Sequence, residues 1–351
     1  MRIASLIVLA ACAGPPSMQD ACPPSKGSLL VVATTDYSTG ALATVDLETG
    51  CVDDRQSSRL GGDPLVIATG DWVAVVLRGD GDAIRLYEPG VWEAPVHEIS
   101  APAGSNIHDV RIVGDLLFAT PYERASVDVY DLGIDTWLAG VDLAAYADGD
   151  GLPEVDRLLL SEDSLLVALQ RLDRNASWAP QAGKILTLDL ASLEISNEQT
   201  TGPNPKLFEG RVLSGIYGTL DGSLETLGGE IVLTESEEGF DFSLYGARED
   251  VALVVGSDFE GQTRIRCRSG EVWQSGPLIS GWVSDLAMVG DEQAVLAVRS
   301  GWYPEAVSGL YTLNVARCEW EGDPVALTLE PYGLAVVDAH ELASRVGWRA
   351  R

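Results

Sequence analysis

The sequence predicts an all-β protein, specifically a β-propeller, and three observations lead to this prediction. Apolar runs of roughly four to eight residues alternate with turns rich in glycine and aspartate along most of the chain. Similar segments recur at a spacing of roughly 35–50 residues, which is typical of propellers and solenoids. The 37 glycines among 351 residues and the scarcity of long helical patterns favour turns and strands.

The segment at residues 28–51 shows the repeating unit most clearly, as a strand, a short loop, a second strand and a polar turn. This first unit, residues 28–53, has no strand ahead of it. The apolar stretch at 332–337 looks like a first strand with no blade after it. A blade completed by strands from both ends of the chain closes a ring and removes exposed sheet edges. We therefore expect seven blades of four antiparallel strands, with six or eight as the near alternatives.

Six further units follow the order of an apolar inner strand, a tight turn, a second apolar strand, a variable loop and outer strands. Stacked blades bury both faces of their strands, so nearly continuous apolar runs are expected. The fifth unit is the least regular. The predicted strands are 64–70, 72–78, 83–88 and 94–99; 108–113, 116–120, 126–132 and 137–143; 154–160, 164–169, 184–190 and one near 195; 206–208, 211–219 and 229–234; 242–245, 251–256, 262–267 and 271–274; and 283–289, 293–298, 309–315 and 318–321.

Two segments carry a family resemblance, residues 43–47 (ATVDL) and 186–190 (LTLDL). They resemble the YVTN-type repeats in seven-bladed propellers of bacterial surface and periplasmic proteins, over about residues 28–340. No Trp-Asp dipeptide ends the strands, as it does in WD40 blades. Two packed β-sandwiches are the rival architecture.

The N-terminus has the layout of an export signal, with one positive charge at Arg2 and an apolar run over residues 3–11 that is too short to span a bilayer. Residues 9–12 (LAAC) resemble the lipobox of bacterial lipoproteins. That resemblance implies cleavage before Cys12 and a lipid on its thiol, and several acyl chains hold a protein firmly in a membrane. The alternative is an ordinary signal peptide whose cysteine is incidental.

The resemblance to Gram-negative lipoproteins also implies a location. Ala13, rather than aspartate, follows the cysteine, which favours the outer membrane, on either its periplasmic or its surface face. The predicted organisation is a signal peptide at 1–11, a lipidated cysteine and flexible Pro-rich tether at 12–27, one propeller at 28–340 and a C-terminal tail at 341–351.

Four cysteines remain if Cys12 carries lipid, and an even number in an exported chain suggests two disulfides. Positions in the units favour Cys22–Cys51 and Cys267–Cys318 among three connectivities. Buried unpaired thiols are the alternative. No CxxC or His/Cys cluster supports a zinc site.

The charge balance is strongly acidic, with 23 Lys+Arg against 53 Asp+Glu and a net charge of −30. Such a surface repels nucleic acid and anionic headgroups, so no nucleic-acid partner is expected. It suits cations, basic partners or simple solubility.

The loop at 148–156 (DGDGLPEVD) carries the most specific candidate site for a cation. Asp148, Asp150, Glu154 and Asp156 alternate around a glycine turn and resemble a shortened calcium loop, because hard cations need several oxygen ligands. The twelve-residue spacing of an EF-hand is missing. An acidic turn between blades is the alternative.

The loop at 170–183 is a candidate recognition loop, because Arg171, Arg174 and Trp178 are unusual in so acidic a chain and Arg and Trp are favoured interface anchors. Its length exceeds that of most connections. The alternative is a loop held by ion pairs to local acids.

Catalytic signals are sparse. His108-Asp109 begins a predicted inner strand and is the best candidate for a polar site near the central funnel, although a structural role, a hydrogen bond to a neighbouring blade, is the favoured interpretation. Trp282, with Trp302 and Tyr303, lines either a groove on one face or the packing between blades. No GxSxG, HExxH, P-loop or SxxK motif is present.

The sequence thus predicts a lipid-anchored propeller of the cell envelope, a non-enzymatic binding or scaffold protein with a protein or glycan partner. The alternative is a cation-dependent enzyme of the lactonase or hydrolase kind that uses the funnel, an idea resting on fold analogy alone. Convergent acids with a bound metal would favour the enzyme, and a plugged channel would favour the binding protein. A haem or quinone carrier lacks CxxCH and a histidine pair.

Overall fold

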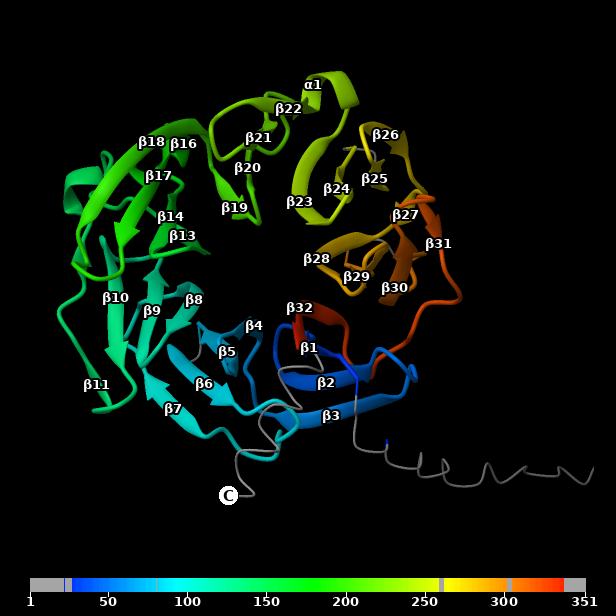
Figure 1. Ribbon diagram of the computed structural model, residues 1–351, viewed down its shortest axis with the longest axis horizontal. Coiled ribbons are helices and arrows are strands. Elements are labelled where there is room, and N and C mark those ends of the chain that lie inside the picture. The colour runs from blue at the N-terminus through cyan, green and yellow to red at the C-terminus, as the bar shows by residue number, and fades with distance from the viewer. Residues whose placement is uncertain (1–21, 23–26, 80, 259–261, 302–304, 338–351) are drawn as a thin grey trace, which may run out of the picture.

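The computed structural model describes residues 22, 27–79, 81–258, 262–301 and 305–337. Seven antiparallel sheets stand in a ring, each with one strand nearest the centre (Figure 1). This arrangement confirms the predicted seven-bladed β-propeller.

Blade one is built from both ends of the chain. Its strand order is β3 (Val52–Ser58), β2 (Gly40–Asp46), β1 (Leu29–Thr35) and β32 (Pro331–Val337). Strands β1 and β32 are antiparallel, with Leu29 opposite Val337 and Val32 opposite Leu334. The prediction that the C-terminal stretch closes the ring beside the N-terminal strand is therefore confirmed.

Blades two to four follow in chain order, and each runs from its inner strand outward. Blade two is β4 (Asp63–Thr69), β5 (Trp72–Arg78), β6 (Ala83–Tyr87) and β7 (His97–Ser100); blade three is β8 (Ile107–Val113), β9 (Leu116–Pro121), β10 (Ser126–Asp131), β11 (Thr136–Trp137) and β12 (Val141–Asp142); blade four is β13 (Val155–Ser161), β14 (Ser164–Leu169), β17 (Ala182–Asp189) and β18 (Ile195–Pro203).

Blades five to seven continue the ring. Blade five is β19 (Lys206–Phe208), β20 (Arg211–Ser214), β21 (Ser223–Thr226) and β22 (Ile231–Thr234); blade six is β23 (Asp241–Arg248), β24 (Val251–Ser257), β25 (Gln262–Ser269), β26 (Val272–Ser275) and β27 (Ile279–Ser280); blade seven is β28 (Trp282–Met288), β29 (Gln293–Arg299), β30 (Gly309–Asn314) and β31 (Glu319–Trp320).

Blade five departs most from the predicted strands. Strand β20 ends at Ser214 rather than continuing to residue 219, and β21 had no counterpart in the prediction. Of the four residues in β21 only Leu224 is buried, so no apolar run marks this strand in the sequence. The outer strand predicted for blade three at 137–143 is two short strands, β11 and β12, which both pair with β10.

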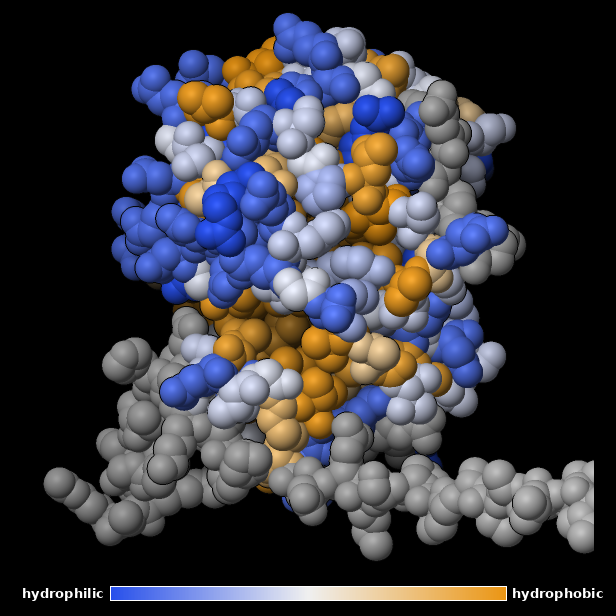
Figure 2. Space-filling view, turned by 90° about the vertical axis from the view of Figure 1, so that its right-hand side faces the viewer, coloured by the Kyte–Doolittle hydropathy of each residue, from blue (hydrophilic) through white to orange (hydrophobic). Residues whose placement is uncertain are grey.

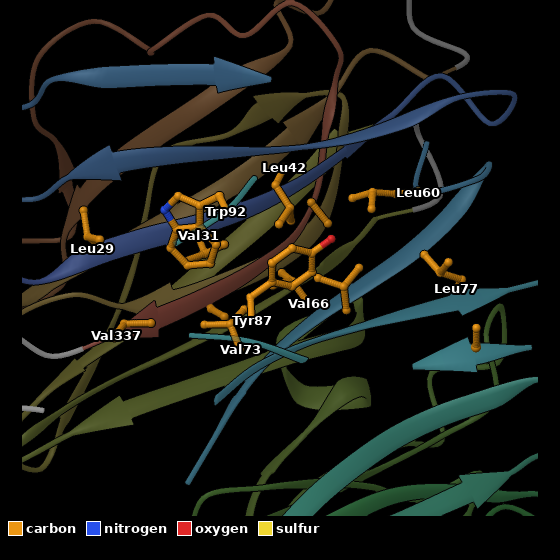
Figure 3. Close-up of a cluster of buried hydrophobic side chains, with 14 residues drawn as sticks. Leu29, Val31, Leu42, Leu60, Val66, Val73, Leu77, Tyr87, Trp92 and Val337 are labelled. Carbon is orange, nitrogen blue, oxygen red and sulfur yellow. The ribbon is translucent and has the colours of Figure 1, made fainter. Parts of the chain in front are cut away.

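The core lies between neighbouring blades. Every residue of β1 and β2 is buried, as expected for strands covered on both faces. Figure 3 shows the cluster that joins blades one and two, where Val31 and Val337 of blade one lie near Val73 and Tyr87 of blade two. A second cluster joins blade one to blade seven and includes Val295.

Two disulfides are present, Cys22–Cys51 and Cys267–Cys318, which confirms the predicted pairing. The second joins blades six and seven, because Cys267 lies in β25 and Cys318 follows β30. Disulfides of this kind persist in oxidising compartments, which is consistent with an extracellular or periplasmic protein. Among the described residues no helix is long and apolar enough to cross a bilayer. The predicted lipidation residue Cys12 lies outside the part that the structure describes.

A buried arginine fastens the closing blade to its neighbour. Arg299, at the end of β29, is 1% exposed. Its guanidinium donates hydrogen bonds to the carbonyl oxygens of Thr35, Glu330 and Pro331, and lies 3.2 Å from the carboxylate of Glu330. Because Thr35 ends β1 and Pro331 begins β32, this one side chain holds the two ends of the chain together.

The outer rim is mainly polar. Figure 2, which looks onto the right-hand side of Figure 1, shows hydrophilic residues over most of the upper part and apolar residues gathered in a hollow lower down.

Candidate functional site

The candidate site lies on the face of the ring where the inner strands begin and the second strands of each blade end, which we call the entry face. A cavity of about 730 Å³ opens there over blades five, six, seven and one. It falls within the range typical of small-molecule sites. The described residues that line it are Tyr37, Asn204, Lys206, Leu213, Gly215, Tyr217, Glu235, Asp241, Phe242, Ser243, Gly256, Ser257, Gln262, Thr263, Gly281, Trp282, Val283 and Gly301.

Two buried carboxylates form the polar part of the cavity wall. Glu235, 1% exposed, begins the short helix α1 (Glu235–Glu238) and accepts hydrogen bonds from the amides of Gly222 at 2.8 Å and Phe242 at 2.7 Å. Gly222 permits this approach, because a Cβ there would lie 2.5 Å from Glu235 Cδ. Glu235 is therefore held by the backbone of two neighbouring blades.

Asp241 begins β23 and is 3% exposed. Its Oδ2 accepts a hydrogen bond from the amide of Gly218 at 2.6 Å, and its Oδ1 has no hydrogen-bond partner among the described residues. Burial raises the pKa of Asp241, the amides of Gly218 and Leu220 oppose that rise, and the charge of Asp221 adds to it. A buried carboxylate oxygen without a donor favours binding of a group that supplies one.

Burial also raises the pKa of Glu235. Its two amide donors oppose the rise, while the neighbouring carboxylates of Asp241 and Asp221 add to it. The acidic side of the cavity is thus a place where negative charge is costly unless a donor or a positive charge enters.

Exposed aromatic side chains surround the cavity. Tyr37 is 57% exposed, Tyr217 75% and Trp282 41%. Tyr332 lies between two of these rings, with centroids 6.0 Å from Tyr37 and 6.3 Å from Trp282 in edge-to-face geometry. The guanidinium of Arg299 lies 4.6 Å from the Tyr37 ring centroid, so this rim is anchored on the same arginine that closes the ring. Aromatic walls with a few polar groups are typical of ligand sites.

Charged groups on the inner strands form a network beside the cavity, which we call the channel network. Asp109 and Asp285 occupy equivalent irregularities in β8 and β28. Each accepts one amide from its own strand and one from the next blade, Leu158 at 2.9 Å for Asp109 and Leu334 at 2.8 Å for Asp285. Burial raises the pKa of both acids, and the charge of Arg157 opposes the rise.

The contact between His108 and Asp156 completes this network. Nδ1 of His108 donates to Oδ1 of Asp156 at 2.9 Å, and the His108 ring stacks on Tyr122 with centroids 4.1 Å apart. Burial raises the pKa of Asp156, but His108, Arg157 and Lys206 outweigh it and hold the pKa below its usual value. Burial lowers the pKa of Lys206, and Asp156 opposes this.

The predicted polar residues His108 and Asp109 lie on the inner strand β8, and both bond to β13 of blade four. Three acids converge with Arg157 and Lys206, so their charges are compensated by protein groups. Among the described residues, the carboxylates close enough together to hold a metal lie elsewhere, two in the loop before β13 and one in β15.

The residues predicted to bind calcium do not all lie in one cluster. Asp148 and Asp150 lie together with Asp173, and one oxygen of each lies within 4.8 Å of the others, a set that could hold a hard cation. Asp156 belongs to the channel network with His108. The spacing in the sequence did not reveal Asp173, which comes from the next loop.

Glu154 lies beside this acidic set and is fully buried. It accepts the amide of Leu172 at 2.9 Å. Burial raises the pKa of Glu154 to about 7, with repulsion from Asp148 and Asp150 adding to the rise. Arg174 forms an ion pair with Glu154, with 3.6 Å between Nε of Arg174 and Oε1 of Glu154.

The predicted recognition loop at 170–183 is ordered by contacts of its own. Arg171 donates to the carbonyl of Ala182 and to Gln181. Arg174 makes a two-pronged ion pair with Glu123, and its guanidinium lies 4.9 Å from the Trp178 ring centroid. Two short strands, β15 (Leu172–Asp173) and β16 (Ala179–Pro180), pair within the loop. Of the three predicted residues, Trp178 presents the most surface, being 53% exposed.

The sequence did not identify the acids or the tyrosines of the cavity. Glu235 and Asp241 fall in and after the least regular unit, between turn glycines, where no motif distinguishes them from surface acids. Trp282, for which the sequence left open a groove or the packing between blades, lines the cavity. Trp302 and Tyr303, named with it, lie outside the described residues.

Comparisons with known proteins show the fold. No protein-family model and no curated protein matches the sequence. A putative 6-phosphogluconolactonase from Bacteroides uniformis ATCC 8492 has a similar structure, with a TM-score of 0.65 and 12% identity over 89% of this chain and 100% of that chain. A second protein so described, from Bacteroides fragilis NCTC 9343, gives 0.62 and 12% over 91% and 100%. Dihydro-heme d1 dehydrogenase NirN in complex with DHE gives 0.53 and 13% over 92% and 77%.

Proposed function

We propose that this protein is a membrane-anchored propeller of the cell envelope that binds a small molecule at the entry-face cavity without transforming it. The observation that carries the proposal is the cavity of about 730 Å³, with exposed aromatic rings at its rim and the unpartnered Oδ1 of Asp241 in its wall. A cavity of this size takes a small molecule, or one residue of a larger protein or glycan partner.

The channel supports binding rather than catalysis. Its acids are tied to backbone amides of the next blade or to Arg157, Lys206 and His108, an arrangement that joins blades. A cation-dependent hydrolase would use acids that converge on an open position for a metal and water. The neighbours described as 6-phosphogluconolactonases support a shared fold, at 12% identity. Lys206 is the only basic residue among the described residues that line the cavity, so a phosphorylated substrate finds little positive charge there.

The lipid anchor is supported by the resemblance of residues 9–12 to a lipobox and by the two disulfides, which suit an exported protein. We expect Cys12→Ser to move the protein from the membrane fraction to the soluble fraction of the envelope. Retention of the variant in the membrane fraction would contradict the anchor, and would leave the cavity proposal standing.

The binding proposal is tested by releasing what the protein carries. The full-length protein is purified in detergent from its native envelope, denatured, and the released small molecules are identified by mass spectrometry. Ser243 lines the cavity and donates one hydrogen bond to the carbonyl of Val255, so Ser243→Phe fills the cavity at the cost of one such bond.

The matched control is Ser196→Phe, because Ser196 is exposed on the outer strand β18 of blade four and donates one hydrogen bond to the carbonyl of Thr187 on the adjacent strand β17. We expect a molecule released by the unmodified protein and by Ser196→Phe, and absent from Ser243→Phe. Identical profiles from all three proteins would overturn the proposal. Hydrolysis of 6-phosphogluconolactone by the unmodified protein, abolished by Ser243→Phe, would show an enzyme instead.

A further inference from the structure

The wall of the entry-face cavity carries acids whose charge no described basic residue offsets. Among the described residues, Oδ1 of Asp241 has no hydrogen-bond partner, although the residue is only 3% exposed. None of the ion pairs among the described residues includes Asp241, Glu235 or Asp221. Buried charge is stable only when paired or neutralised, so this wall is incomplete as the protein alone presents it.

Lys206, the basic residue that lines the same cavity, has a different partner. Its charge is stabilised by Asp156 in the channel network, and Arg157 stands beside it. Lys206 is therefore paired with Asp156, and no ion pair among the described residues offers a positive charge to Glu235 or Asp241.

The rim of the cavity offers a second kind of attraction for positive charge. The faces of aromatic rings are negative and attract ammonium and guanidinium groups, with quaternary ammonium as the best-known ligand of such rings. Tyr37 already holds the Arg299 guanidinium at 4.6 Å, which shows this interaction in the same rim. Tyr217 and Trp282, both exposed, are the further rings at the cavity.

We propose that the ligand of the entry-face cavity is an organic cation, an amine or quaternary ammonium compound, whose positive group lies near Asp241 and whose apolar part lies against the aromatic rim. This inference rests on the proposed function, because it names the class of ligand for the same cavity. An ammonium N–H would donate the hydrogen bond that Oδ1 of Asp241 lacks, and a quaternary nitrogen would place a positive charge beside it. The described part of the chain places its cluster of potential metal ligands in another loop, which favours an organic cation over a metal ion here.

The first test is the charge of the molecule released from the purified protein. We expect a cation. Release of a neutral or anionic molecule that Ser243→Phe excludes would overturn the cation and keep the binding function. The absence of any molecule specific to the cavity would overturn the binding function itself.

The second test uses choline and its neutral carbon isostere, 3,3-dimethylbutan-1-ol, titrated calorimetrically into the detergent-purified full chain at physiological salt, with glucose as a neutral sugar. We expect choline to bind and the isostere to bind at least roughly tenfold more weakly, because only choline carries charge. Equal binding of choline and its isostere, or binding of glucose alone, would overturn the inference.

Two variants test whether choline binding depends on the negative charge of Asp241. Asp241→Asn retains an oxygen that can accept the Gly218 amide and removes the negative charge, so choline affinity should fall roughly tenfold or more. Asp189→Asn is the matched control, since Asp189 is partly exposed and accepts amides of its own turn in blade four. An unchanged choline affinity in Asp241→Asn would overturn the role of this acid.

Trp282→Ala keeps the test decisive if Asp241→Asn folds poorly. Trp282 is 41% exposed, so its removal costs little packing. We expect it to weaken choline more than the isostere. Equal weakening of both ligands would show an apolar contact rather than recognition of positive charge.

Discussion

Replacing Arg299 by methionine should weaken the closure of the ring more than any other single change to a charged residue of blade seven. Methionine keeps the apolar stem and removes the guanidinium. The carbonyls of Thr35, Glu330 and Pro331 and the carboxylate of Glu330 then each lose one donor. The Thr35 amide still donates to the Glu330 carbonyl, the Ser284 hydroxyl to the Pro331 carbonyl and Ser300 to the Glu330 carboxylate. Removing one partner of a buried ion pair costs about 3–5 kcal/mol, a large share of the about 5–15 kcal/mol that stabilises a domain. Because the Glu330 side chain is 27% exposed and keeps Ser300 as a donor, we expect a loss toward the lower end of that range.

The assay is urea unfolding followed by tryptophan fluorescence, because the chain has nine tryptophans. Arg317→Met is the control. Arg317 is also a blade-seven arginine with a carboxylate partner, Glu321 at 2.6 Å, but its side chain is 59% exposed, so the expected loss is below about 1 kcal/mol. If Arg299→Met also lowers the free energy of unfolding by less than about 1 kcal/mol, the idea that this side chain stabilises the pairing of β1 with β32 is refuted.

Three further changes test other parts of the structure. Replacing Cys267–Cys318 by two alanines releases a loop of 51 residues and should cost up to about 4 kcal/mol in urea unfolding, whereas an unchanged midpoint would show that the bond adds nothing. Because the folded-state pKa of Glu154 is raised from 4.5 to about 7, the stability it contributes is full below about pH 4.5 and is lost as the pH rises through 7. Glu154→Gln should flatten that fall in melting temperature, and an unaltered pH profile would contradict the assignment. Gly256→Ala should destabilise blade six, since the new Cβ would lie 1.6 Å from the Asp241 carbonyl oxygen. The control is Gly228→Ala, whose new Cβ would have its nearest atom at 3.6 Å, and it should have the melting temperature of the unmodified protein. Equal melting temperatures for the two variants would contradict this prediction.

The ring could be predicted from the sequence because its physical cause is local. Strands buried on both faces need continuous apolar runs, and stretches such as 72–78 and 293–299 supply them with turns at regular intervals. The closing pair was predictable for a related reason, since the stretch at 332–337 had no partner strands of its own. The strands of blade five were predicted incompletely because the short strand β21 buries only Leu224.

The cavity could not be predicted because its parts come from four blades. Tyr37, Tyr217, Asp241 and Trp282 are distant in sequence and meet only when the ring closes. The predicted cation loop shows the same limit. Asp148 and Asp150 were found by their spacing, but the third carboxylate belongs to a different loop, and nothing local marks it.

The most direct test of the central claim, that the entry-face cavity is the ligand site, is hydrogen exchange of the full chain with and without saturating choline. The amides of Gly218, Gly222 and Phe242 are bonded to the two wall carboxylates, so binding should slow their exchange together. Slower exchange confined to the loop at 170–183, with these three amides unchanged, would place the ligand elsewhere and contradict the account.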